Sequence, residues 1–240
     1  MTGGNMYEWV GYTWNPLAGA CPHDCEYCYV KDLARRFPNL RKKYTGPIRI
    51  DEKALNQKLP KNKTIFVCSM NDLFASEIPD EMIDVILRKA SEYNDNLFLF
   101  QTKNPRRLID WIGRFPRRCV FATTIESNRS LIKTKAPPPW KRYADFKEFK
   151  NAMMEESKAY VYEITIEPIL DFDDELVEWL FDIAPNFVSI GADSKGHNLP
   201  EPSEKKIVNL VDTLCNAGFS VHLKKNLKRI APRVFEEVMR

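Results

Sequence analysis

Short apolar runs recur along the chain, and longer segments with apolar residues at helical spacing separate them. The short runs are typical of buried strands, whereas the longer segments are typical of amphipathic helices. The pattern predicts strands over residues 8–14, 64–68, 96–101, 118–124, 159–166, 187–190 and 219–223.

Helix signals stand between these strands. Pro79 precedes two acidic residues, as the first turn of a helix prefers, while Ser203 is a suitable N-cap and Gly218 a suitable residue just past a helix end. The predicted helices cover residues 27–37, 79–93, 105–115, 143–156, 174–183, 203–217 and 227–239, with a short one near 52–58. Two stretches are expected to be mostly irregular, namely 38–63 and 125–142.

Strands and helices alternate in roughly seven units of roughly 30 residues, which predicts an α/β fold with a parallel sheet. Right-handed crossovers between such strands give a partial or near-complete (β/α) TIM-type barrel, or an open doubly wound sheet. The 240 residues contain no obvious linker. We therefore expect one barrel domain over residues 1–240, with a core of about 8–226 and a C-terminal helix of about 227–239.

Half of the six cysteines lie within eight positions, as Cys21, Cys25 and Cys28 directly after the first predicted strand. Thiolates suit iron–sulfur clusters and zinc. Three of them on one loop can bind three irons of a [4Fe–4S] cluster, which leaves the fourth iron without a protein thiolate and open to a ligand. Two alternatives are a zinc site completed by His23 and unrelated free thiols.

Active sites of parallel barrels lie at the carboxyl ends of the strands, so polar residues there are candidates. Asp72 and Glu167 each follow an apolar run, where a carboxylate needs either a partner or a function. A salt bridge to Lys103 or Lys224 accounts for them as well as a ligand contact does. The remaining polar residues after the strands are Ser69, Asn71, Gln101, Thr102, Thr123, Thr124, Glu126, Asp193 and Lys225.

The scattered cysteines are expected to behave as small apolar residues. Cys119 and Cys215 lie in or beside apolar runs, so we expect both in the core, whereas Cys68 ends a strand and can face the site. Tyr27 directly precedes the third clustered cysteine. It is expected to shield a cluster or stack on a ligand ring, with ordinary core packing as the alternative.

Composition excludes several classes of protein. No apolar run is long enough to span a membrane, and the first residues lack the basic and apolar regions of a signal peptide. The cysteine pattern is not that of a secreted disulfide framework, so we expect a cytoplasmic location. The net charge is +3, and basic residues recur with aromatic residues between them. They predict either a nucleic-acid-binding surface or an ordinary solvated basic face.

The C-x3-C-x2-C motif of residues 21–28, with an aromatic before its last cysteine, resembles the cluster loop of the radical S-adenosylmethionine (radical SAM) superfamily. Over about residues 8–226 the chain further resembles an uncharacterised radical SAM-like family that is named after phage proteins and is distantly similar to spore photoproduct lyase. Four segments carry this second resemblance: Thr13-Trp14-Asn15-Pro16, Ser69-Met70-Asn71-Asp72-Leu73-Phe74, Gln101-Thr102-Lys103-Asn104-Pro105 and Glu167-Pro168-Ile169-Leu170.

The resemblance implies a [4Fe–4S] cluster on the three clustered cysteines, with S-adenosylmethionine on the open iron. One electron then cleaves S-adenosylmethionine to methionine and a 5′-deoxyadenosyl radical, which takes hydrogen from a substrate. It also implies an electron donor such as flavodoxin or ferredoxin. The implied cofactor contacts are Tyr27, Ser69, Asn71, Asp72, Gln101, Thr124, Glu126 and Glu167. Candidate substrate contacts are Lys103, Asp193, Lys224 and Lys225.

The leading expectation is a radical SAM enzyme, of lyase or transferase type, that modifies or repairs DNA or RNA. A base in a duplex would have to be flipped out to reach such a radical. Two alternatives stay open: a radical SAM enzyme acting on a peptide or small molecule, and a non-catalytic module that binds nucleic acid with a cluster or zinc.

Overall fold

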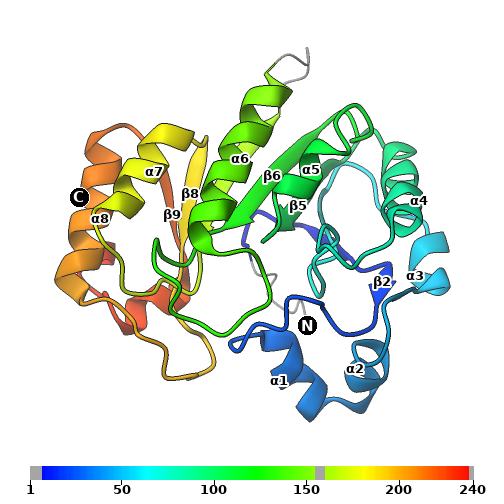
Figure 1. Cartoon of the computed structure of the whole chain (residues 1–240), viewed down its shortest axis with the longest axis horizontal. Helices are drawn as coiled ribbons and strands as arrows, with labels where there is room; N and C mark the ends of the chain where they lie inside the picture. The colour runs from blue at the N-terminus through cyan, green and yellow to red at the C-terminus, as the bar shows by residue number, and fades with distance from the viewer. Residues whose placement is uncertain (1–6, 155–159, 238–240) are drawn as a thin grey trace.

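Seven parallel strands form the centre of the computed structural model, which describes residues 7–154 and 160–237 (Figure 1). The strand order is β1-β4-β5-β6-β7-β8-β9, so each strand pairs with the next one along the chain apart from the excursion of β2 and β3. The seven strands are β1 (Tyr12–Trp14), β4 (Thr64–Val67), β5 (Leu97–Thr102), β6 (Cys119–Thr124), β7 (Val161–Ile166), β8 (Phe187–Ile190) and β9 (Ser220–Leu223).

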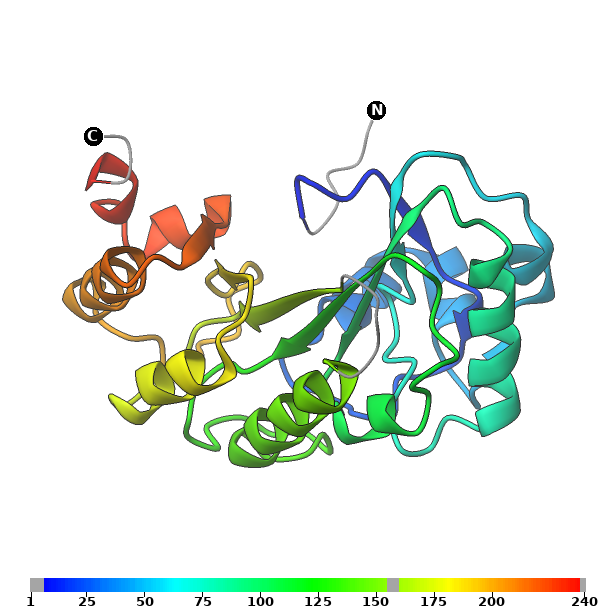
Figure 2. The ribbon, with the colours of Figure 1, turned by 90° about the horizontal axis from the view of Figure 1, so that it is seen from above.

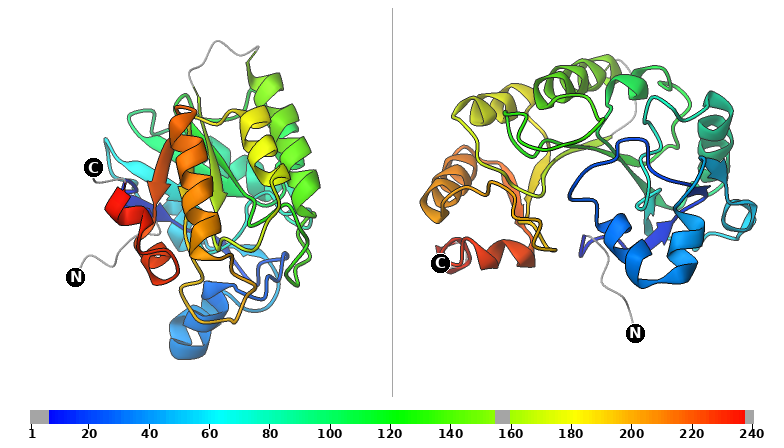
Figure 3. Two further views of the ribbon diagram at one scale, coloured as in Figure 1. Left: turned by 90° about the vertical axis from the view of Figure 1, so that its left-hand side faces the viewer. Right: turned by 60° about the horizontal axis from the view of Figure 1, so that its bottom comes forward.

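Helices cover the outer, convex face of this sheet (Figures 2 and 3). Several of them are amphipathic; α8 (Glu204–Asn216), for example, turns Ile207, Leu210, Val211 and Leu214 inward and is capped by the Ser203 side chain, which accepts from Lys206 N. The helices are α1 (Tyr29–Arg36), α2 (Pro38–Lys43), α3 (Glu52–Asn56), α4 (Asp80–Ser91), α5 (Arg106–Ile109), α6 (Pro139–Met153), α7 (Glu175–Ile183), α8 (Glu204–Asn216) and α9 (Val234–Glu237), with a 3₁₀ turn, η1, at Lys225–Arg229.

The sheet curves but does not close, because β1 and β9 remain its two edges within the described residues (Figure 3). This confirms the predicted α/β fold with a partial TIM-type barrel. Residues 7–10 lie inside the curve, where Tyr7 and Val10 pack with Phe66, Leu99 and Val120 in an inner apolar cluster. The larger apolar core lies on the other side of the sheet, beneath the helices.

Alternation along each strand produces these two cores. In β5, Phe98 and Phe100 belong to the core beneath the helices, whereas Leu99 belongs to the inner cluster. Polar residues of the same inner face, such as Gln101, come at the carboxyl ends of the strands. The inner face is therefore apolar at the amino ends of the strands and polar at their carboxyl ends.

Several predicted boundaries are wrong. The stretch 38–63 contains α3, as the short helix predicted near 52–58, but also α2 and β3 (Arg49–Ile50), which were not predicted; β3 pairs antiparallel with β2 (Leu17–Ala18). Helix α6 begins at Pro139 rather than at 143, because a proline is favourable in the first turn of a helix. The predicted helix 105–115 ends at Ile109.

The predicted C-terminal helix 227–239 is also wrong, because η1 and α9 are separate elements on either side of Pro232. Residues 1–6, 155–159 and 238–240 lie outside the described residues. The ends predicted at Glu156, Ala159 and Met239 and the features of the first five residues fall there.

Two smaller expectations have mixed outcomes. Cys119 is buried as predicted, but Cys215 is exposed on α8, so its predicted place in the core is wrong. No helix in the described ranges is both long and apolar enough to cross a membrane.

Candidate functional site

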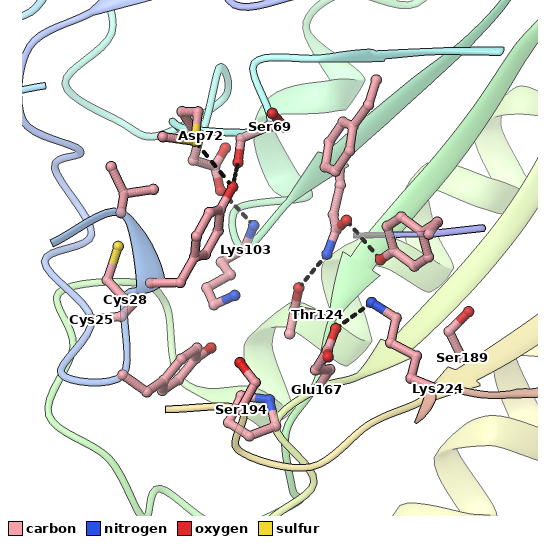
Figure 4. Close-up of a pocket in the computed structure, with 18 of the residues that line it drawn as sticks. Cys25, Cys28, Ser69, Asp72, Lys103, Thr124, Glu167, Ser189, Ser194 and Lys224 are labelled. Atoms are coloured by element: carbon pink, nitrogen blue, oxygen red, sulfur yellow. Dashed lines mark hydrogen bonds and ion pairs between the residues drawn. The ribbon is translucent and has the colours of Figure 1, made fainter. Parts of the chain in front are cut away.

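A cavity of about 880 Å³ opens at the carboxyl ends of the strands. Cysteines of the loop after β1 line one end, and Glu167 and Lys224 lie across the cavity from them (Figure 4). All of the predicted site residues line it except Glu126, which lies behind the wall, and Thr123, which is buried and donates to Thr102 O. Residues that were predicted from their places at strand ends therefore lie around one cavity, although they are up to 204 positions apart in the sequence, from Cys21 to Lys225.

The cysteine loop is held by backbone hydrogen bonds from a distant segment. Glu26 N donates to Lys133 O at 3.0 Å and Lys135 N donates to His23 O at 2.7 Å. Asp24 adopts a left-handed conformation with φ of 50°, which turns the chain between the first two cysteines. The segment 133–135 belongs to the connection between β6 and α6 that the sequence predicted as a long loop.

The three thiols are free and lie at one end of the cavity. Burial is the main reason that the pKa of Cys21 is raised to about 12 and that of Cys25 is also raised. No three His, Cys, Asp or Glu side chains in the described ranges converge as ligands of a single metal ion. A [4Fe–4S] cluster does not need three side chains to converge on one metal ion, because each of its irons takes only one thiolate.

Asp72 is a buried hub beside this loop. Its Oδ2 accepts from His23 Nε2 at 2.9 Å and from Lys103 N at 2.7 Å, while Oδ1 accepts from Thr102 Oγ1 at 2.7 Å and Phe74 N at 3.0 Å. Burial alone would raise its pKa, but His23 and these donors hold the pKa of Asp72 below its ordinary value. Because Asp72 fixes His23, the imidazole predicted as an alternative zinc ligand is already engaged.

Asn71 offers an unused acceptor in the same wall. Its Nδ2 donates to Gly19 O at 3.1 Å, but its buried Oδ1 has no hydrogen-bond partner among the described residues. Ser69 lies close by, with Oγ donating to Asn15 Oδ1 at 3.1 Å. A buried carbonyl oxygen without a donor is costly, so a ligand that donates to it is favoured there.

A second buried network lies behind Tyr27. The Tyr27 hydroxyl donates to Glu126 Oε1, and Arg142 NH1 pairs with Glu126 Oε2 at 2.6 Å. Lys103 Nζ lies 3.6 Å from Glu126 Oε1 and 5.4 Å from the centre of the Tyr27 ring. Burial would raise the pKa of Glu126, but Arg142 and then Lys103 keep that pKa below its usual value. Glu126 is therefore an anionic anchor for two cavity-lining side chains.

Thr124 lies in the middle of the wall (Figure 4), and Gln101 lines the same cavity. Gln101 Nε2 donates to Thr124 Oγ1 at 2.9 Å, and Gln101 Oε1 accepts from the Tyr7 hydroxyl at 2.8 Å. The Tyr7 hydroxyl also lies 2.9 Å from Thr165 Oγ1. Tyr7 thus ties the segment before β1 to β5 and β7.

Glu167 and Lys224 form an ion pair across the end of the cavity away from the cysteines (Figure 4). This agrees with the predicted salt bridge between these two residues. Asn226 Nδ2 donates to Glu167 Oε1 at 2.9 Å, and Lys224 Nζ lies 3.8 Å from the centre of the Tyr7 ring. A Cβ at Gly191 would lie 2.7 Å from Glu167 Oε1, so a side chain at this position would displace the Glu167 carboxylate.

Asp193, on the loop after β8, is engaged by His197. His197 Nδ1 lies 2.8 Å from Asp193 Oδ1, and its Nε2 lies 3.1 Å from Oδ2 of Asp32 on α1. Lys225 points out to solvent and pairs with Glu8 at 2.7 Å. These contacts join the two halves of the open barrel beside the cavity.

The sequence analysis missed several residues of the site. Tyr7, Ser189 and Asn226 line the cavity, and Arg142 holds Glu126 from α6. Asn226 was detectable, since it directly follows two lysines that were predicted at the end of the last strand. Arg142 gave no signal, because Lys141-Arg142 at the end of the predicted irregular stretch 125–142 resembles an ordinary basic surface pair.

A family model supports a relationship over most of the chain, since it matches residues 5–171. The chain belongs to the DUF5131 family. This family is described as a protein of unknown function, and its description does not mention phage proteins. That finer part of the expected resemblance stays a prediction. A comparison with curated proteins found no match for the DUF5131 chain.

Solved structures are similar to this member of DUF5131 in fold. A spore photoproduct lyase variant with bound AdoMet and dinucleoside spore photoproduct has a TM-score of 0.57 at 13% identity, over 87% of this chain and 74% of that one. SuiB of Streptococcus suis bound to S-adenosylmethionine has a TM-score of 0.55 at 11% identity, over 94% of this chain and 54% of SuiB. The DUF5131 chain thus has a fold similar to the partial barrel of radical SAM enzymes.

Proposed function

We propose that this DUF5131 protein is a radical SAM enzyme that holds one [4Fe–4S] cluster on Cys21, Cys25 and Cys28. One observation carries the proposal: three free thiols on a single loop line one end of a cavity at the carboxyl end of a partial barrel. Three thiolates leave one iron for another ligand, and the cavity has room for one.

The donor set around the cavity fits S-adenosylmethionine. The ligand carries an ammonium group, and the unpartnered Asn71 Oδ1 beside Ser69 is an acceptor for it. Asp72 is better suited to holding the wall, because its oxygens already accept four hydrogen bonds. Of the three residues that the sequence suggested in this loop as contacts for the ammonium group, Asn71 and Ser69 therefore remain.

Further contacts follow from the same wall. Tyr27 offers a ring face for adenine, while Gln101, Thr124 and Glu167 offer polar groups for the ribose and carboxylate. Glu126 acts through Tyr27 and Lys103 rather than by direct contact, since it is buried behind them. When bound, the reduced cluster supplies one electron that splits the sulfonium into methionine and a 5′-deoxyadenosyl radical.

The proposed substrate is a nucleic acid, in a modification or repair reaction. The end of the cavity away from the cysteines carries Lys224 and Lys225 together with the aromatic residues Tyr7 and Trp9. Cations combined with aromatic rings suit a phosphate backbone and an unstacked base. The proposal includes a cytoplasmic location, in keeping with a cysteine pattern unlike that of a secreted disulfide framework, and an electron donor of the flavodoxin or ferredoxin type.

Anaerobic reconstitution with iron and sulfide tests the cofactor proposal. We expect a brown protein with the broad visible absorbance that is typical of iron–sulfur clusters. After addition of dithionite and S-adenosylmethionine, we expect formation of 5′-deoxyadenosine. Cys25→Ala is expected to lose both signals, whereas Cys215→Ala, which changes an exposed cysteine on α8, keeps them. A colourless, zinc-loaded protein or a Cys25→Ala variant with a full cluster would contradict the proposal.

Asn71 provides a separate test of S-adenosylmethionine binding. Loss of one hydrogen bond to a charged group predicts that Asn71→Ala binds S-adenosylmethionine about tenfold more weakly, measured by calorimetry on the reconstituted protein. Cluster absorbance serves as the internal control, because Asn71 Nδ2 also holds Gly19 O near the cysteine loop. Unchanged affinity with full cluster absorbance would remove Asn71 from the binding site.

A further inference from the structure

The positive charge of the protein is concentrated in one part of the chain. Residues 31–63 contain eleven Lys and Arg against three Asp and Glu, a local charge of +8, although the whole chain carries only +3. The rest of the chain is therefore acidic, at −5. A charge of this size in a segment of an otherwise acidic protein indicates a polyanionic partner more strongly than the overall charge does.

Most of this charge is not neutralised within the fold. Ion pairs take up three of the eleven cations, Lys31 with Asp24, Arg35 with Asp32 and Lys43 with Asp51. The other eight form no ion pair with any residue in the ranges 7–154 and 160–237. Their charge is therefore directed to solvent, except where backbone carbonyls accept from them.

Two arginines have a structural task in this segment. Arg41 donates to Ala34 O and Arg35 O at the end of α1, and Arg49 donates to carbonyls that include Lys42 O at the end of α2. Cations at helix carboxyl ends are favourable because of the helix dipole. Arg36 and Lys42 make no such contact in the described part of the chain and are exposed, so they are available to a partner.

An exposed aromatic residue lies between these cations. Phe37 separates α1 from α2, and 52% of its surface is exposed. We define Arg35, Arg36, Phe37, Arg41 and Lys42 as the α1–α2 surface. Cations around an open aromatic ring are the combination with which proteins hold single-stranded nucleic acid, because the ring stacks on a base while the cations neutralise phosphates.

The α1–α2 surface lies beside the cavity. Cys28 is the N-cap of α1, and Val30 and Leu33 of the same helix line the cavity. Figure 3 shows α1 and α2 projecting from the rest of the fold at the end toward which the strands point. On the opposite side of the cavity, Lys195 and Lys225 are exposed lining residues, and Lys225 pairs there with the exposed Glu8. Cations therefore flank the opening on both sides.

We propose that the α1–α2 surface binds the backbone of a single-stranded nucleic acid, or of a locally opened duplex, next to the cavity. A strand held there runs across the opening toward Lys195 and Lys225, which places part of the strand above the cavity. This inference rests on the proposed nucleic-acid substrate and assigns to it a surface outside the cavity. It needs no bound cofactor, because all of its contacts come from side chains of the chain itself.

Fluorescence anisotropy with a short labelled oligonucleotide, single-stranded or duplex, tests the surface over a range of salt concentrations. Arg36→Gln/Lys42→Gln is expected to weaken binding about tenfold at low salt. It is also expected to lower the slope of log affinity against log salt by about 1.4, the value for two lost phosphate contacts on a single strand. Phe37→Ala is expected to weaken single-strand binding at least about fivefold and duplex binding less, because only unstacked bases reach the ring.

A matched control comes from the same basic segment. Lys61→Gln/Lys63→Gln removes the same charge from two exposed residues directly before β4, at the amino-terminal edge of the sheet and away from the cavity. Its binding is expected to stay within about twofold of the wild type, since these lysines contact no phosphate in this arrangement. Thermal unfolding should be the same for both double variants, because all four side chains are exposed.

The outcomes separate this inference from the proposed function. Equal loss in both double variants would mean diffuse charge attraction and would overturn the α1–α2 surface. The surface is also wrong if Arg36→Gln/Lys42→Gln keeps nucleic-acid affinity but weakens binding of an acidic electron-carrier protein. No binding of any oligonucleotide by the wild type at low salt would overturn the nucleic-acid substrate as well. The 5′-deoxyadenosine assay reports on the cofactor chemistry independently of all three results.

Discussion

At the scale of single residues, Glu163 is the most unusual group in the protein. It lies on the inner face of β7, fully buried, between the apolar inner cluster and the polar floor of the cavity. Ser189 Oγ donates to its Oε1 at 2.6 Å, but its Oε2 has no hydrogen-bond partner among the described residues. Burial raises the pKa of Glu163 to about 7. A carboxyl group in such a place keeps its proton in mildly acidic solution.

This position predicts a pH-dependent cost to stability. The folded pKa of about 7 lies above the ordinary value of 4.5, so the unfolded chain releases the proton first and stability falls as pH rises from about 4.5 to about 7. Glu163→Gln has no proton to release. We expect the variant to gain up to about 3 kcal/mol relative to wild type between pH 4 and pH 8, measured by urea unfolding.

The control for this measurement is Glu178→Gln, which removes an exposed carboxylate from α7. Its stability relative to wild type should change little over the same pH range, because this side chain is exposed and its replacement leaves the buried Glu163 in place. Parallel pH curves for wild type and Glu163→Gln would contradict the raised pKa of Glu163.

At the scale of the elements, the sequence predicts the parallel strands well and their connections poorly. Each of the seven strands in the sheet overlaps a predicted run. The signal is continuous in a central strand such as β6, which is buried on both faces, whereas the edge strand β9 is partly exposed. The stretch 38–63 lacks that signal, since α2 and α3 each have fewer than seven residues and little apolar surface. Short elements are held by contacts such as Trp14 Nε1 to Ala54 O, which connect distant parts of the chain.

The same contrast applies to the site. Residues were predicted from the rule that barrel sites lie at the carboxyl ends of the strands. Most of them line one cavity in the structure, because parallel strands all end at the same edge of the sheet. The sequence did not show which side chains of the site form hydrogen bonds and ion pairs with one another. Glu126 was expected to contact a cofactor, yet Arg142 on α6 and Tyr27 hold it behind the wall. Such pairings depend on how helices pack on the sheet, for which a single sequence gives no distance.

At the scale of the whole molecule, an open barrel needs contacts other than strand pairing to hold its two halves together. His197, on the loop after β8, provides one by lying between Asp193 and Asp32 of α1. Burial would lower its pKa, but Asp193 and then Asp32 raise the pKa of His197 above its ordinary value. Arg35 also pairs with Asp32, at 3.1 Å. The contact connects the loop beside the cavity to the helix that follows the cysteines.

The charged form of His197 should therefore stabilise the contact between the loop after β8 and helix α1. Because its folded pKa is raised, this contribution is present below the unfolded pKa of about 6.5 and is lost as pH rises through the folded pKa. We expect wild type to lose about 1 kcal/mol, or about 3 °C in melting temperature, between pH 6 and pH 8 relative to His197→Gln. Hydrogen exchange at residues 193–197 should accelerate over the same range in wild type alone.

His222→Gln serves as the control. The imidazole of His222 stacks on Phe187, and burial lowers its pKa instead of raising it. If wild type and His197→Gln respond to pH in the same way, the two halves are held by other contacts, such as Glu8 with Lys225.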